Sequence, residues 1–238
     1  QQGDMTPSDH IKQLREQIAQ VEKECNYKES LAYTTNMPIA RLQLKKAEVA
    51  AQQQWGYYLS AISGFTDRAM RALERIKDRE PYYAENGTLS ELAYTTRNDG
   101  TTQPWYLYLP KDYDPARKWA LIVFLHGYVP TTSVLDPWVL SKDVCEIAGD
   151  NEAMLLIPYG RRNTDFQGVG EIDVLRTTEL AKELYSVDDS RIYISGVSMG
   201  GMGAWNMALR HPGMYAAATP IAGHTDMHVW WRRGGLLN

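Results

Sequence analysis

The sequence predicts an α/β fold built on a mostly parallel sheet with helices on both faces. From residue 119 onward, short apolar runs alternate with longer amphipathic runs, the pattern of strands joined by crossover helices. In one such repeat, the strand-like run 191–195 leads through residues 196–200, Gly-Val-Ser-Met-Gly, into a helix-like run. This junction and the alternation together indicate a sheet whose strand ends carry chemistry.

The chain begins with a helical segment, which we assign to residues 1–85. Apolar residues recur at alternating steps of three and four, as on one face of a helix: Ile11, Leu14, Ile18, Val21 and Cys25. Residues 26–36 read as a linker, and Met37-Pro38 opens a second long helical region. We predict a helical hairpin or small helical cap. Its apolar stripe is expected to pack on the rest of the chain, on a partner or on a second copy.

A second domain is predicted over residues 86–238. It opens with two β-rich runs, 89–97 and 103–109, around an Asn-Asp-Gly turn that is typical of an antiparallel hairpin. The apolar runs 119–125 and 153–158 are short and unbroken, as in strands buried on both faces. The hairpin makes the predicted sheet mixed.

The remaining elements follow in alternation. Helices are expected at 139–148, at 171–185, where Val174, Leu175, Leu180 and Leu184 are apolar, and at 199–210, before His211-Pro212. Strands are expected at 191–195 and 215–221. Strands separated by helices run parallel because each crossover returns the chain to the same end of the sheet.

Composition excludes several classes of protein. Of 238 residues, 44% are hydrophobic and 23% charged, with a net charge of −4, which is ordinary for a globular chain and shows no basic excess for nucleic acid. No apolar run approaches the ~20 residues of a membrane span. The two cysteines, Cys25 and Cys145, are too few for a metal site or a disulfide framework. We expect no metal, no cofactor, no nucleic-acid partner and no membrane partner.

Ser198 is the candidate nucleophile. A serine hydroxyl reacts only with a base in reach and with donors for the developing oxyanion, and a sharp strand-to-helix turn exposes it to both. Gly196 and Gly200 flank it without side chains to block the approach. The N–H of Met199 lies at a helix N-terminus, where negative charge is favoured, and is the first candidate oxyanion donor. The alternative interpretation is a merely structural turn serine.

A second donor is predicted after the strand 119–125, where His126-Gly127-Tyr128 follows. A His-Gly pair at the end of such a strand suits the other half of an oxyanion hole, and the N–H of Tyr128 is the candidate donor. Gly127 supports the turn. We interpret His126 as a residue that bonds loop backbone and not as a catalytic base.

These motifs resemble the α/β-hydrolase superfamily, above all serine esterases of the prolyl-oligopeptidase and polyhydroxybutyrate-depolymerase-like group. The resemblance covers residues 89–226 and depends on segments 105–110, 121–127, 170–174, 191–201 and 217–223. It implies an enzyme acting on carboxylic esters, such as acetyl or feruloyl groups on saccharides, or on peptides. In this resemblance Ser198 is the nucleophile and Met199 and Tyr128 are the oxyanion donors.

The resemblance also places a catalytic acid and a histidine after further strands, beyond residue 238. We therefore expect the C-terminal strands of the sheet to be missing from this chain, leaving the edge of strand 215–221 open. His224 and Asp226 follow that strand, with His228 nearby, at the edge that carries Ser198. They could replace the missing base and acid, line a pocket or brace a loop.

Three functions are compatible with the sequence. The first is a serine esterase, which the resemblance implies to be bacterial and secreted. The start at Gln1, as after removal of a leader, is in keeping with a secreted or periplasmic protein. The second is a peptidase of the prolyl-oligopeptidase type. The third is a hydrolase-like binding module that lacks an acid and a base.

Overall fold

The computed structural model describes residues 6–53 and 56–226. The chain divides into two compact units, which are described in turn. The helical unit combines Gln1–Tyr83 with Leu92–Pro104, and the sheet unit combines Ala84–Glu91 with Trp105–Asn238. The sequence placed a single domain boundary between residues 85 and 86. In the structure, Leu92–Pro104, which contains the turn of the predicted hairpin, groups with the helices.

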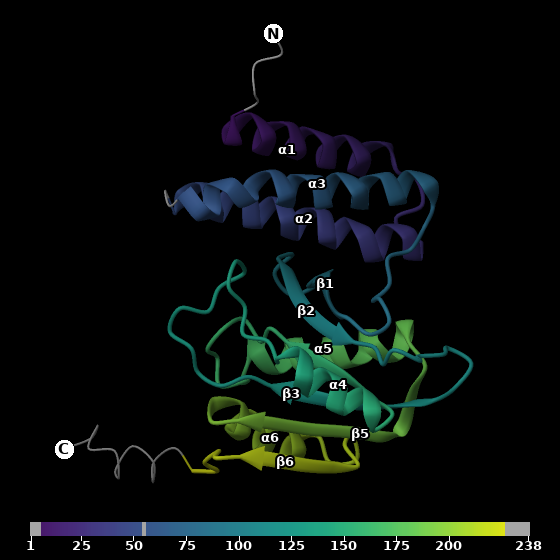
Figure 1. Ribbon diagram of the computed structural model, residues 1–238, viewed down its shortest axis with the longest axis vertical. Helices are drawn as coiled ribbons and strands as arrows, with labels where there is room; N and C mark the ends of the chain where they lie inside the picture. The colour runs from purple at the N-terminus through teal and green to yellow at the C-terminus, as the bar shows by residue number, and fades with distance from the viewer. Residues whose placement is uncertain (1–5, 54–55, 227–238) are drawn as a thin grey trace, which may run out of the picture. The chain divides into compact units, whose positions relative to one another are not determined.

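Three helices form the body of the helical unit: α1 (Pro7–Glu24), α2 (Leu31–Gln52) and α3 (Gly56–Asp78). They contact one another pairwise and lie side by side in Figure 1. Thr6 starts α1 with a reciprocal cap, because its hydroxyl accepts from the Asp9 N–H while the Asp9 carboxylate accepts from the Thr6 N–H. The predicted stripe of α1 is buried: Ile11, Leu14, Ile18 and Val21. The sequence predicted a hairpin of one helix near residues 11–25 and one long helical region from Met37. The structure has two helices, α2 and α3, in that second region, and α1 packs on both.

The start of α2 corrects the sequence prediction. The helix begins at Leu31, where the Ser30 hydroxyl accepts from the Tyr33 N–H, and Pro38 lies inside it. The segment 34–36 looked like a linker because Thr and Asn are weak helix formers. Here each of these three side chains donates to the carbonyl four residues back, so their donor groups are satisfied within the helix.

The sheet has six strands in the order β1-β2-β4-β3-β5-β6 (Figure 1). They are β1 (Leu89–Thr95), β2 (Thr102–Tyr108), β3 (Trp119–Leu125), β4 (Ala153–Pro158), β5 (Val187–Val197) and β6 (Ala217–Ile221). β2 pairs antiparallel with β4, while β3, β4, β5 and β6 are parallel. The predicted mixed, mostly parallel sheet is confirmed.

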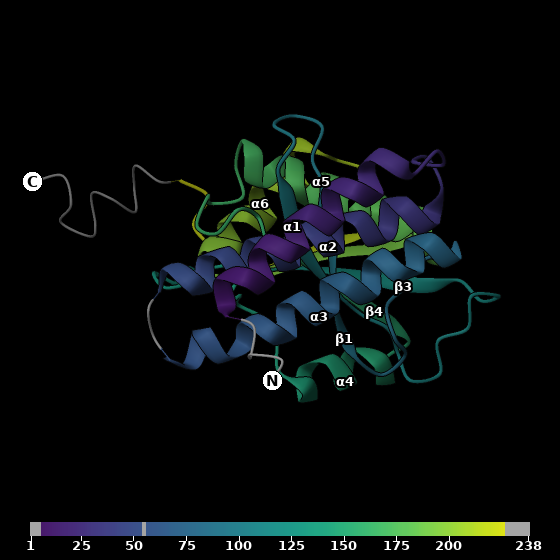
Figure 2. The same cartoon turned by 90° about the horizontal axis from the view of Figure 1, so that it is seen from above.

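Helices cover both faces of this sheet. Figure 2 shows α4 (Lys142–Asp150) on one side of the strands and α5 (Val169–Leu184) and α6 (Met199–Arg210) on the other. Every residue of β4 is buried, and the β3 residues Leu121, Val123 and Leu125 are fully enclosed. Because helices cover both faces of β3 and β4, neither strand has a face open to water, and their sequences contain almost no polar residue.

β5 starts four residues earlier than the sequence suggested. Its first part, 187–190, is polar, and the register against β3 shifts between Trp119 and Leu121. The Asp188 carboxylate accepts from the Ser190 hydroxyl at 2.6 Å and from Arg191 Nε at 2.8 Å. These hydrogen bonds, the one from Ser190 above all, lower the pKa of Asp188 to about 2. Local side-chain bonds thus hold an irregular strand start that no apolar pattern indicates.

The carboxyl ends of four neighbouring parallel strands meet at one edge of the sheet. The segments that leave this edge follow β3 at His126, β4 at Tyr159, β5 at Ser198 and β6 at Ala222. In open α/β sheets ligands bind at this edge. None of the helices in the described ranges is both long and apolar enough to cross a membrane.

The central strand is expected to dominate the stability of the sheet unit. Leu121→Ala removes a side chain that is 0% exposed and should lower the free energy of unfolding by about 2–5 kcal/mol. The matched change Leu209→Ala, at a side chain that is 68% exposed, should shift it by less than about 0.5 kcal/mol. Urea unfolding followed by circular dichroism measures both. Equal effects of the two substitutions would contradict the assignment of β3 to the core.

Candidate active site

Ser198 lies at the turn between β5 and α6, with φ 55° and ψ −115°. This backbone conformation is rare for any residue other than glycine and costs about 1–3 kcal/mol. The Ser198 N–H donates to the Ile221 carbonyl at 2.8 Å, and its carbonyl accepts from the Met202 N–H at 3.0 Å. The residue is exposed, and its hydroxyl makes no capping bond to α6. The turn therefore holds the serine backbone and leaves its hydroxyl accessible.

Glycines on either side of Ser198 allow this turn. A β carbon at position 200 would lie 1.9 Å from the carbonyl oxygen of Leu125, and one at position 196 would lie 2.3 Å from that of Gly200. Real β carbons do not approach backbone atoms this closely. Helix α6 can thus begin directly against β3 only with glycine at both positions.

A second glycine pair closes the turn from the side of β6. A β carbon at Gly223 would lie 2.2 Å from the backbone carbon of Gly201, and one at Gly201 would lie 2.5 Å from the Ile221 carbonyl oxygen. The segment after β6 therefore passes directly over the first turn of α6. Sequence reasoning treated Gly201 only as a thin helix start and gave Gly223 no role at the site.

The loop after β3 runs beside Ser198. A β carbon built on Gly127 would lie 3.5 Å from the Val197 carbonyl and 3.9 Å from the Ser198 β carbon. The backbone that continues into Tyr128 thus borders Ser198. The Tyr128 ring is 62% exposed, whereas the Met199 side chain is buried. At both of these residues it is the backbone N–H that the predicted site uses.

His126 is buried and occupied at both ring nitrogens. Nδ1 lies 2.9 Å from the Gly127 carbonyl oxygen and Nε2 lies 3.0 Å from the Tyr159 carbonyl oxygen. A carbonyl oxygen can only accept, so a ring nitrogen that hydrogen-bonds to either carbonyl does so as a donor. The Phe166 ring contacts the imidazole edge-on, with centroids 5.1 Å apart. The ring faces loop backbone, and neither nitrogen is available to take a proton from Ser198.

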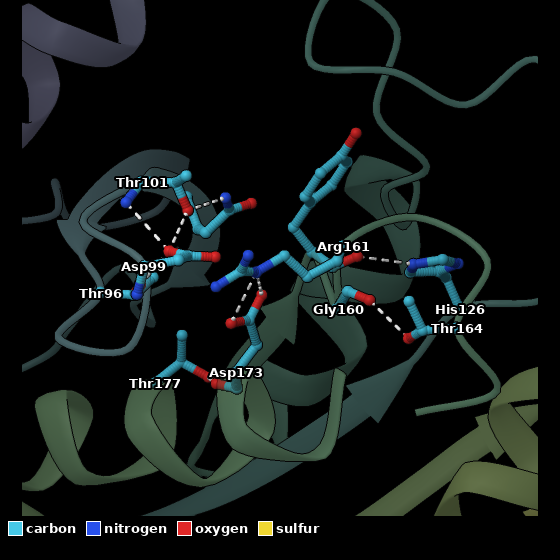
Figure 3. Close-up of polar contacts among 11 residues, drawn as sticks. Thr96, Asp99, Thr101, His126, Gly160, Arg161, Thr164, Asp173 and Thr177 are labelled. Carbon is cyan, nitrogen blue, oxygen red and sulfur yellow. Dashed lines mark hydrogen bonds and ion pairs between the residues drawn. The ribbon is translucent and has the colours of Figure 1, made fainter. Parts of the chain in front are cut away.

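The sequence analysis assigned no role to Asn163, in the loop between β4 and α5. Asn163 uses its side-chain amide to accept from the Val129 N–H at 3.2 Å and to donate to the Val129 carbonyl at 2.8 Å. Figure 3 shows the Arg161 guanidinium facing the Asp173 carboxylate, and the Thr164 hydroxyl bonded to the Gly160 carbonyl, close to His126. The Asp173 carboxylate that Arg161 pairs with is only 2% exposed.

His224 and Asp226 lie in the segment after β6, and both side chains are exposed. Their roles as base and acid remain predictions, and His228 lies outside the described residues. Within the described ranges, no hydrogen bond joins the Ser198 hydroxyl to a histidine. His211 is engaged at the far end of α6, where its Nε2 lies 2.7 Å from the Glu171 carboxylate.

A comparison with models of protein families identifies the family of this chain. Residues 100–235, more than half of the chain, match the model of the family described as "Putative esterase". This match bears out the resemblance to hydrolases of the esterase type. No curated protein matches the chain.

Solved structures similar to this chain include three hydrolases. A thermostable esterase is 26% identical, with 59% of this chain and 42% of that one covered and a TM-score of 0.43. S-formylglutathione hydrolase from Staphylococcus aureus is 17% identical, with 61% of each chain covered and a TM-score of 0.48. A feruloyl esterase module from Clostridium thermocellum is 17% identical, with 62% of each chain covered and a TM-score of 0.47. The chain spans less than two thirds of the length of each.

The glycine contacts give a first test at the site. Gly200→Ala forces a β carbon onto the Leu125 carbonyl and should unfold the sheet unit or lower its stability by more than about 3 kcal/mol. Gly64→Ala, in α3 with open space around the added carbon, should raise stability by about 0.5–1 kcal/mol. Thermal unfolding measures both, and a tolerated alanine at position 200 would contradict this geometry.

Alkaline pH gives a second test. Burial raises the pKa of Tyr159 to about 12, above the value of about 10 for an exposed phenol. As the pH rises above 10, the unfolded chain loses this proton first, so the Tyr159 contribution to stability is complete below pH 10 and is lost by about pH 12. Tyr159→Phe should make the fall in unfolding free energy between pH 10 and 12 shallower. Identical slopes in urea titrations would contradict the burial of this hydroxyl.

Proposed function

We propose that this chain, which belongs to the family described as "Putative esterase", hydrolyses carboxylic esters through Ser198. One observation carries the proposal. Ser198 is an exposed serine at a strained strand-to-helix turn, with the backbone of Gly127 directly alongside. A structural turn serine needs neither the strain nor an open hydroxyl, whereas a nucleophile needs both.

The chemistry is acyl transfer. The Ser198 hydroxyl oxygen attacks the ester carbonyl carbon, the carbonyl oxygen becomes an oxyanion, and the alcohol leaves with a proton. The Met199 N–H, at the N-terminus of α6, and the Tyr128 N–H stabilise this oxyanion. Water then attacks the acyl-serine, which releases the acid and restores the hydroxyl. Two donors on two separate strand ends form the oxyanion hole.

The general base that activates Ser198 is a histidine, and two positions in the protein could supply it. In the first, His224 with Asp226 reaches Ser198 from the segment after β6. In the second, the histidine comes from outside the described residues. The first source is the one to test first. Gly223, directly before His224, packs against Gly201 in the first turn of α6, close to Ser198 in the chain.

The proposed substrates are esters of small molecules or saccharides. The Tyr128 ring, 62% exposed at the loop that borders Ser198, offers a flat amphipathic surface to an aryl acyl group or a sugar ring. Peptide bonds are the alternative substrate, and a comparison of kcat/KM on acetylated or feruloylated xylan fragments and on short peptides decides between them. Secretion from a bacterial cell stays a prediction.

The central test is Ser198→Ala. The purified 238-residue chain should react with a fluorophosphonate probe and hydrolyse an aryl acetate, and Ser198→Ala should reduce both by more than about a thousandfold. Ser195→Ala is the matched control, because this neighbouring hydroxyl on β5 donates to the Thr219 carbonyl, and it should keep its reactivity within about threefold.

Further outcomes of the same assay separate the alternatives. Loss of labelling in His224→Ala, with normal thermal unfolding, would assign the base to His224. Labelling unchanged in that variant would assign the base elsewhere. An unlabelled parent chain would contradict the esterase proposal for these residues and support a binding module.

A further inference from the structure

We infer that Asn163 is a positioning residue for the oxyanion hole, fixing the loop that presents the Tyr128 N–H to Ser198. The inference rests on the proposed function and adds a residue to it. Asn163 belongs to the loop between β4 and α5, not to the strand ends that carry Ser198 or Tyr128. Its side chain binds both polar groups of a single residue, Val129.

The direction of the Tyr128 N–H is set by its two neighbouring peptide groups. On the amino side, the Gly127 carbonyl lies 2.9 Å from His126 Nδ1, and in a planar trans peptide the following N–H points the opposite way. On the carboxyl side, the Val129 N–H donates to Asn163 at 3.2 Å. Both peptide planes that flank Tyr128 are therefore held, and with them the Tyr128 N–H. Neither holding group contacts the reacting atoms.

The loop that carries Asn163 is itself rigidly held. Arg161 Nε lies 3.2 and 3.3 Å from the two carboxylate oxygens of Asp173, and the Thr164 hydroxyl donates to the Gly160 carbonyl at 2.6 Å. Phe166 is fully buried against the His126 ring. Figure 3 shows the contact of Arg161 with Asp173 and that of Thr164 with Gly160.

Backbone strain in this loop supports a positioning role. Four non-glycine residues have φ between 51° and 74°: Arg161, Arg162, Asp165 and Phe166. Such conformations cost of order 1–3 kcal/mol each and persist where the surroundings impose them, often at functional sites. A loop that only connected β4 to α5 would not need them.

The two contacts of Asn163 need an amide. An oxygen is required to accept the Val129 N–H, and an NH₂ group is required to donate to the Val129 carbonyl. Asn163→Asp keeps the acceptor but sets a carboxylate oxygen against a carbonyl oxygen, which repels it. Asn163→Ala removes both bonds. Gln167→Ala, at an exposed position of the same loop, is the matched control.

The kinetic experiment compares an aryl ester with its thionoester, in which sulfur replaces the carbonyl oxygen and accepts hydrogen bonds poorly. In single-turnover acylation, Asn163→Ala should lower the ester rate about 10–100-fold, less than the loss of a whole donor, with substrate affinity kept within about threefold. Because the thionoester gains little from the donors, its rate should change less, so the ester-to-thionoester ratio should fall at least about fivefold. Asn163→Asp should behave like Asn163→Ala, and Gln167→Ala should match the parent.

Equal losses on ester and thionoester would overturn the inference, since a general structural defect does not discriminate between oxygen and sulfur. Hydrogen exchange of the Val129 N–H is the second measurement and does not depend on activity. Asn163→Ala should speed that exchange at least about tenfold. An unchanged exchange rate would also overturn the inference. An unreactive parent chain with faster exchange in the variant would instead reject the esterase proposal while retaining the brace between Asn163 and Val129.

Discussion

Helix α6 and strand β3 approach each other so closely that the Leu125 carbonyl oxygen lies where a side chain of residue 200 would be. Most of the site depends on this approach. It brings the first turn of α6 against the end of β3, so that Met199 and the loop after Leu125 meet at one place. Ser198 joins β5, the neighbour of β3, to α6, and the sharp turn there lets α6 begin directly against the end of β3. The strained serine thus accompanies the close packing of α6 on β3.

The packing places two backbone segments together but does not by itself orient them. Orientation comes from hydrogen bonds between loops that leave neighbouring strands. His126 connects its own loop to Tyr159 after β4, and Asn163 returns from that loop to Val129. The sheet therefore supplies the positions of the reacting groups, and the adjoining loop supplies their directions. The proposed site needs few side chains at the reacting atoms, since its proposed donors are peptide N–H groups.

The sequence predicted those parts of the molecule that follow from local pattern. Buried strands such as 119–125 and 153–158 show unbroken apolar runs, and the turn at Ser198 has a short, specific motif, so both were found with correct bounds. The start of α2 was wrong because its residues are stabilised by side-chain bonds that propensity does not express. The role of Asn163 was missed for a related reason. Its partner, Val129, is 34 residues away, and a contact at that distance leaves no periodic signal.

The Ser198 N–H donates a hydrogen bond to the Ile221 carbonyl. This bond continues the pairing of β5 with β6 as far as Ser198. Four of the five β6 residues are exposed, so this strand has little packing of its own to resist displacement. A displacement of β6 would therefore reach the Ser198 backbone through the Ile221 carbonyl. The β6 edge of the sheet is thus coupled to the turn at Ser198 by this one hydrogen bond.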